Sequence, residues 1–132
     1  MTQRYVLRAH EYLEAIEDGA TGERLAAFYT ANAVQEEFPN RLSPNGVRRG
    51  LAEILEGAAR GQAVMRRQRF VVHNVIASGH QVVLEVTWAG TVAIPIGTVP
   101  PGGEMRARFC VVLEFEGDRI RRQRNYDCFD PF

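Results

Sequence analysis

The sequence contains no lysine. All 16 basic side chains are arginines, and they balance 16 acidic side chains to a formal net charge of zero. The absence of lysine excludes a Schiff-base nucleophile, a phosphate-loop lysine and a Ser-Lys dyad. A chain without net positive charge is also a poor candidate for binding nucleic acid through its overall field. Several classes of chemistry are therefore excluded before any motif is considered.

Aspartate and cysteine are also scarce. Aspartate occurs four times, against twelve glutamates, and cysteine occurs only as Cys110 and Cys128. Two cysteines in a core-forming domain do not make a disulfide framework, and no spacing typical of a zinc site is present. We therefore expect two free, buried thiols, a cytoplasmic protein and no metal.

Long apolar runs are missing too. No segment approaches the roughly 18 uninterrupted apolar residues of a membrane helix, so we expect no membrane partner. The N-terminal stretch MTQRYVLRAHEYLE lacks the apolar segment of a signal peptide. The 132 residues, 45% of them hydrophobic, predict a single domain over 1–132 with one core and room for a cavity.

Helical spacing dominates the N-terminal half. Residues 4–17 place apolar side chains, Tyr12 among them, on one face, and Gly19 is suited to end this helix. Thr21 can cap a short second helix. Its expected buried face comprises Leu25, Phe28 and Tyr29. A short strand over 33–38, a turn-rich stretch and a third helix from about Leu51 follow.

The pattern changes to period two from about residue 70. Four strands are expected, at 70–77, 81–91, 105–115 and 118–129. The apolar but Pro- and Gly-rich segment 93–103 joins the second and third of them. Helices followed by antiparallel strands indicate an α+β fold, three helices packed on a strongly curved sheet. The concave space between them is the default ligand site.

The last expected strand departs from the others. Strands 81–91 and 105–115 alternate between an apolar and a largely polar face, so each has a clear inside and outside. The last strand instead carries Gln123, Asn125 and Asp127 on one parity. Buried polar groups need partners or water, which a dry core does not offer. We therefore expect these three side chains to line a cavity wall.

Four segments carry a resemblance to a known family. They are LEAIEDG, AAFYTANAVQEEFP, RRGLAEIL and EFEGDRIRRQRNYD, in this order and spacing. The chain resembles the nuclear transport factor 2-like superfamily, in the branch of SnoaL-like polyketide cyclases and ketosteroid isomerases, over nearly its whole length. The resemblance implies a cone-shaped α+β barrel, no cofactor, and a homodimer through the outer face of the sheet, where each patch must match itself.

The resemblance also implies roles for particular residues. Ketosteroid isomerases place an oxyanion-holding tyrosine seven residues before the glycine that ends the first helix, where Tyr12 stands. Their general base corresponds to Glu37, and their second oxyanion donor, an aspartate, corresponds to Val111, so that donor is missing. SnoaL-like cyclases instead carry a working aspartate on the last strand, where Asp127 stands. Related epoxide hydrolases need an Asp-Arg-Asp set, which Glu85, with its outward parity, does not supply.

These residues define a proton-transfer hypothesis. A carboxylate in an apolar pocket has a raised pKa and can move a proton next to a carbonyl, while a tyrosine steadies the enolate. Asp127, Glu37 and Tyr12 are the expected catalytic residues. The expected substrate-binding residues are Trp88, Asn125, Gln123, Phe28, Phe38, Phe109 and Val111.

A structural alternative stands beside each assignment. Tyr12 and Trp88 are equally suited to the core, Glu37 to an ion pair with an arginine, and Asp127 to capping a turn. His73 is expected to be a hydrogen-bonded structural residue. The arginine-rich stretches 60–69 and 119–124 are expected to pair with glutamates on neighbouring strands rather than with nucleic acid.

Two functions therefore remain open. One is a cofactor-independent isomerase or cyclase that moves a proton on a small hydrophobic carbonyl compound. The other is a non-catalytic module of the same fold, which binds an apolar ligand or mediates dimerisation.

Overall fold

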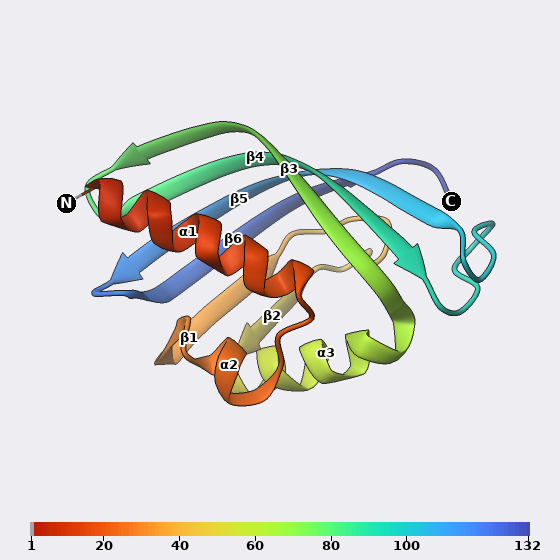
Figure 1. The fold of residues 1–132 in the computed structure, drawn as a ribbon, viewed down its shortest axis with the longest axis horizontal. Coiled ribbons are helices and arrows are strands. Elements are labelled where there is room, and N and C mark those ends of the chain that lie inside the picture. Colours follow the sequence, from red (N-terminus) through yellow and green to blue (C-terminus); the bar gives the residue numbers. More distant parts are fainter. Residues whose placement is uncertain (1) are drawn as a thin grey trace.

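The computed structural model describes residues 2–132 and consists of three helices and six strands (Figure 1). The helices are α1 (Thr2–Glu17), α2 (Gly22–Ala26) and α3 (Leu51–Val64). The strands are β1 (Tyr29–Glu37), β2 (Val47–Gly50), β3 (Met65–Ser78), β4 (Gln81–Val92), β5 (Glu104–Glu116) and β6 (Arg119–Phe129).

The strands form one sheet in the order β2-β1-β6-β5-β4-β3. All neighbours are antiparallel except β1 and β6, which run parallel. The sheet curves around α1, which contacts β3 and β4, while α3 covers the end near β1 and β2 (Figure 1). The α+β prediction is confirmed, but the sheet does not close, so the barrel is open between β2 and β3.

Three boundaries differ from the sequence expectation. Helix α2 ends at Ala26, so Phe28 lies outside it and the buried Tyr29 begins β1. Strand β2 lies inside the stretch expected to be turns, where it pairs with the end of β1. Strand β3 begins at Met65 because residues 65–69 pair with the end of β4. Strand β2 and the first residues of β3 are mostly polar and show no alternation of apolar and polar side chains. Their strand conformation is therefore specified by pairing with neighbouring strands.

The convex face of the sheet carries paired charges. Arg124 forms an ion pair with Glu114, and Arg122 lies 3.6 Å from Glu36, as the arginine-rich strands predict. Cys110 and Cys128 are free. Cys110 is only half-buried and Cys128 is exposed, so the expectation of two buried thiols is wrong, since both lie on the outward parity of their strands, β5 and β6.

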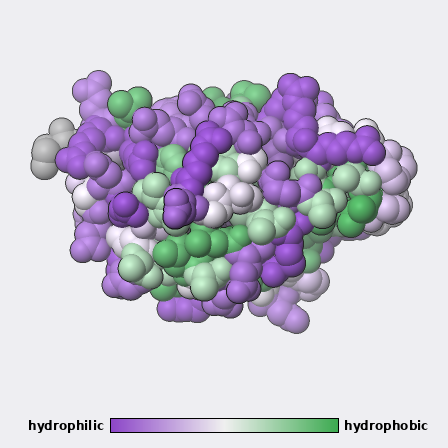
Figure 2. Space-filling model, turned by 60° about the horizontal axis from the view of Figure 1, so that its bottom comes forward, coloured by the Kyte–Doolittle hydropathy of each residue, from purple (hydrophilic) through white to green (hydrophobic). Residues whose placement is uncertain are grey.

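The apolar interior divides into two clusters. The larger packs α1 against the concave face of β4 and β5, through side chains such as Leu13, Leu84 and Leu113. The smaller surrounds Trp88 and is covered by the segment 93–103 and by Phe132. Within residues 2–132, no helix combines the length and apolarity needed to cross a bilayer. On the side that bears α2 and α3, the surface is mainly hydrophilic with a band of hydrophobic side chains (Figure 2).

Candidate active site

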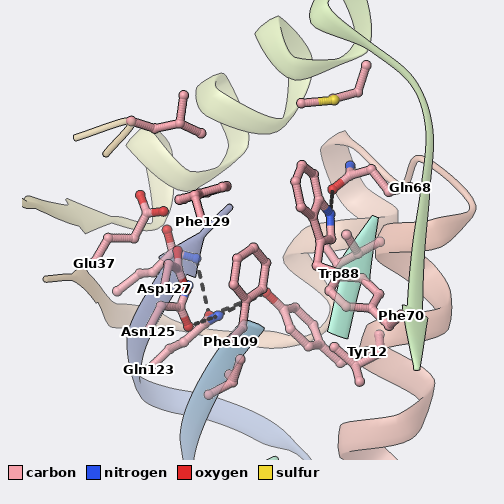
Figure 3. A pocket seen from close by; sticks show the side chains of 16 residues that line it. Tyr12, Glu37, Gln68, Phe70, Trp88, Phe109, Gln123, Asn125, Asp127 and Phe129 are labelled. Carbon is pink, nitrogen blue, oxygen red and sulfur yellow. Dashed lines mark hydrogen bonds between the residues drawn. The ribbon is translucent and has the colours of Figure 1, made fainter. Parts of the chain in front are cut away.

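A cavity of about 250 Å³ lies where the two apolar clusters meet (Figure 3). Sixteen side chains line it: Tyr12, Leu13, Ile16, Gln35, Glu37, Leu42, Met65, Gln68, Phe70, Trp88, Phe109, Val111, Gln123, Asn125, Asp127 and Phe129. They come from α1, the sheet strands other than β2, and the segment after β1. Most of the expected site residues are thus brought together in one place.

The sheet register gives the cavity a polar and an apolar wall. Glu37 on β1 pairs with Asn125 on β6, which in turn pairs with Val111 on β5. One step along, Asp127 on β6 pairs with Phe109 on β5. Side chains in such a row lie on the same face of the sheet. In these two rows the polar side chains come from β1 and β6, and the apolar ones from β5.

Asp127 is the unusual group of the polar wall. Its Oδ1 atom is buried and has no hydrogen-bond partner among the described residues. Burial, and to a lesser extent the negative charge of Glu37, raises the pKa of Asp127 from its ordinary value of 3.8 to about 7. A carboxyl group with this pKa can both accept and return a proton near neutral pH. Asp127 lies within β6 and lines the cavity, so the alternative that it caps a turn is wrong.

Glu37 is held by an arginine that the sequence analysis missed. Arg49 on β2 forms an ion pair with Glu37 and also donates a hydrogen bond to Gln35 Oε1 at 3.1 Å. Both side chains of the ion pair are about three-quarters buried, with 23% and 22% of their surface exposed. The ion-pair alternative for Glu37 is therefore realised. Only the pairing of β2 with β1 identifies Arg49 as the partner, and β2 has no alternating apolar pattern.

Two tyrosines and a glutamine form a buried hydrogen-bond network. Tyr29 donates from its hydroxyl to Gln123 Oε1 at 2.7 Å, and the Tyr12 and Tyr29 hydroxyl oxygens lie 2.8 Å apart. Gln123 is only 2% exposed, and its Nε2 donates to Tyr12 at 3.2 Å and to Asn125 Oδ1 at 3.2 Å. Burial raises the pKa of both tyrosines, so both stay protonated. The network links Tyr12 on α1 to the polar wall on β6.

Removal of one hydroxyl from this network is expected to destabilise the fold. Tyr29→Phe removes the hydrogen bond to Gln123 Oε1 and the contact with the Tyr12 hydroxyl, whereas Gln35 Nε2 still donates to Gln123 Oε1 at 3.2 Å. The loss of these bonds is expected to cost about 0.5–1.5 kcal/mol in the free energy of unfolding. Urea denaturation of the two proteins measures this difference. Tyr126→Phe is the matched control, because the Tyr126 side chain is exposed on the convex face and its hydroxyl has access to water. Equal losses in both variants would contradict the network account.

Aromatic side chains form the apolar wall. Trp88 stacks on Phe109 with ring centroids 5.5 Å apart, and Phe129 packs edge-on against both. Trp88 also donates from its indole nitrogen to Gln68 Oε1 at 2.9 Å. Phe129 and Gln68 were not among the site residues expected from the sequence. Phe129 shares the inward parity of Asp127 on β6, so the period-two pattern was sufficient to identify it.

Phe28 and Phe38, expected at the substrate, lie elsewhere. Phe28 packs edge-on against Tyr12 in the main core, with the guanidinium of Arg8 4.0 Å from its ring centroid. Phe38 follows the inward-facing Glu37 and therefore has the opposite parity. It stacks on Tyr126, whose side chain is outward. Neither phenylalanine lines the cavity.

The remaining titratable candidates lie on the convex face. His73 Nε2 is 2.6 Å from Thr87 Oγ1, and Glu85 accepts a hydrogen bond from Asn74 at 2.8 Å. Neither lines the cavity. Across residues 2–132, no group of three His, Cys, Asp or Glu side chains is placed to hold a metal ion.

A family model agrees with this architecture. The model described as a SnoaL-like domain matches residues 9–123, which is most of the chain. No match was found among curated proteins.

Solved structures share the fold at low sequence identity. IdmH of Streptomyces antibioticus, named as a candidate polyketide cyclase, is 20% identical, with a TM-score of 0.76 over 93% of this chain and 91% of that chain. An LEH-like epoxide hydrolase of M. tuberculosis is 23% identical, with a TM-score of 0.69 over 98% and 84%. A phenazine biosynthesis-related protein of Pseudomonas aeruginosa is 13% identical, with a TM-score of 0.73 over 96% and 80%.

Proposed function

Because the chain belongs to the family of SnoaL-like domains, we propose that it is a cofactor-independent isomerase or cyclase that moves a proton on a hydrophobic carbonyl compound. One observation carries the proposal. The Asp127 carboxyl group lies in a cavity with an aromatic wall, its Oδ1 has no hydrogen-bond partner within residues 2–132, and its pKa is about 7. A binding module gains nothing from a desolvated carboxylate without a partner, whereas a general base needs one.

In the proposed reaction Asp127 acts as the base. Its carboxylate takes a proton from a carbon next to the carbonyl. The C–H electron pair forms a C=C bond to the carbonyl carbon, and the π pair of the C=O bond moves onto oxygen to give an enolate. The protonated Asp127 then returns the proton to another carbon or to oxygen. Glu37 is less suited to this role because Arg49 already occupies its carboxylate. Its negative charge serves instead to raise the pKa of Asp127.

The network behind the cavity supplies a donor for the enolate oxygen. The Tyr12 hydroxyl accepts a hydrogen bond from Gln123 Nε2, which leaves its own proton for a substrate oxygen in place of Tyr29. A donor held in position stabilises developing negative charge without reorganisation. Trp88 and Phe109 offer stacked rings against which a flat substrate can pack.

Hydrogen exchange of a simple ketone tests the proposal. The protein is expected to accelerate exchange of the α-protons of 1-tetralone in D₂O, followed by NMR, by about 10²–10⁴-fold over buffer. The carboxylate is the active form and its pKa is about 7, so the protein-dependent rate should rise with pH through 7 and level off above it. Binding of 1-tetralone without any exchange would favour the non-catalytic ligand-binding alternative.

A further inference from the structure

A second hollow continues from the cavity toward the surface. This outer chamber has a volume of about 460 Å³ and lies between the end of α1 and α3. It shares five lining residues with the inner cavity: Ile16, Glu37, Leu42, Met65 and Gln68. The two hollows therefore adjoin at these five side chains, so the outer chamber is the nearest space for the tail of a substrate seated at Asp127.

Two arginines meet at one point of the outer chamber. Arg49 on β2 and Arg60 on α3 both line it. A Cβ atom placed on Gly57 would lie 3.9 Å from Arg49 Nε and 3.9 Å from Arg60 Nη2. The two nitrogens are thus less than about 8 Å apart, so one carboxylate lying just beyond the Cβ position can give an oxygen to each at the ~2.8 Å of a charge-assisted hydrogen bond.

The orientation of each guanidinium leaves these nitrogens free for a ligand. Arg49 uses Nη1 for Glu37 and Gln35, and Arg60 directs Nη1 to Glu56 at 4.0 Å. The opposite edges, Arg49 Nε and Arg60 Nη2, both face the space beside Gly57. Glu37 therefore holds Arg49 in place, whereas Arg60 is largely exposed, with 72% of its side-chain surface accessible, and can adjust toward a ligand.

Gly57 keeps this space empty. A glycine inside a helix is less stable than alanine, and no positive φ requires one at this position. A side chain here would fill the point that both arginines approach. We propose that Arg49, Arg60 and the empty side-chain position of Gly57 form an anion-binding subsite, which holds a carboxylate of the substrate at the mouth of the active site.

This subsite narrows the class of substrate. The inner cavity takes a flat, apolar ring with an enolisable carbonyl, and the outer chamber takes a tail that ends in a carboxylate. The prediction of an enolisable ring rests on the proposed function. The prediction of a carboxylate tail does not, since binding of the tail requires no catalysis. An aryl keto acid such as 3-(2-naphthoyl)propionate has both parts, and its methyl ester lacks only the charge.

Comparison of this acid with its ester tests the subsite. Trp88 is the only tryptophan and lines the inner cavity, so its fluorescence reports binding of either compound. Wild-type protein should bind the acid about tenfold more tightly than the ester, which is what hydrogen bonds to a charged group contribute. Arg60→Gln and Gly57→Ala should each remove most of this preference, Arg60→Gln by loss of the charge and Gly57→Ala because the added methyl group keeps the carboxylate from both arginines.

Two further variants separate the possible outcomes. Gly61→Ala makes the same helix substitution one turn later, where a Cβ meets nothing within 4 Å, and it should keep the preference. Asp127→Asn should also keep it, whether or not the protein proves to be an enzyme. Equal binding of acid and ester to the wild type, including no binding of either, would overturn the proposal. So would an equal loss of preference in Gly57→Ala and Gly61→Ala.

Discussion

Asp127→Asn is expected to lower the rate of 1-tetralone exchange by about 10²–10⁴-fold, the usual contribution of a positioned general base. Asparagine has nearly the shape of aspartate but cannot accept the proton. Because Asp127 Oδ1 has no hydrogen-bond partner among the described residues, the exchange of oxygen for an amide breaks no observed interaction of that atom. The effect should therefore fall on turnover, with ligand binding retained.

The stability of this variant is a control against unfolding. The pKa of Asp127 is higher in the folded protein than in the unfolded chain, so its ionisation opposes folding. The wild type should lose stability from this group as the pH rises from about 4 to 7, and the variant should not. Above pH 7 Asp127→Asn should therefore be at least as stable as the wild type in urea denaturation. Unchanged exchange in a folded variant would disprove the role of Asp127 as the base.

Gly90→Ala is expected to destabilise the protein by about 1–3 kcal/mol and to disrupt the aromatic wall, as overpacking a core does. Gly90 lies two residues after Trp88 on the same face of β4, and the indole lies across it. An added Cβ would be 2.4 Å from Trp88 Cζ2 and 3.0 Å from Met65 Sδ. The indole has to move, which breaks its stack on Phe109 and its hydrogen bond to Gln68.

Urea denaturation and the emission of Trp88 measure this change. Gly90→Ala should lower the denaturation midpoint, shift the emission maximum and weaken binding of naphthyl ketones. Ala89→Val is the matched control, since it adds more volume to the same strand but on the opposite face, away from the cavity. A Gly90→Ala protein with wild-type stability and wild-type emission would contradict this prediction, because it would show that the indole accommodates the added methyl group without moving.

Long patterns in the sequence predicted most of the fold. The helix over 4–17 and the strands 81–91 and 105–115 are specified by repeated apolar spacing, which outweighs any single residue. Strand β2 and the first residues of β3 were missed because they are short and polar. Such segments become strands only when a neighbouring strand offers hydrogen bonds.

The alternation of side chains along the strands predicted most of the cavity-lining residues on β6. The polar parity of β6 predicted that Gln123, Asn125 and Asp127 line a cavity, and the structure places all three there. The positions of aromatic residues near the ends of strands were harder to predict from the sequence. Phe28 and Phe38 lie next to buried positions, and one residue of shift in the element boundary or the parity moves such a ring to another surface.

The α+β order, the inward residues of the long strands and the absence of lysine can all be read from the sequence alone. The pairing of Arg49 with Glu37, and the approach of Arg49 and Arg60 to the space beside Gly57, become visible only in three dimensions. The physical reason is distance along the chain. A periodic pattern records which face of its own element a residue occupies, whereas contacts between elements depend on how the sheet curves and which strands pair.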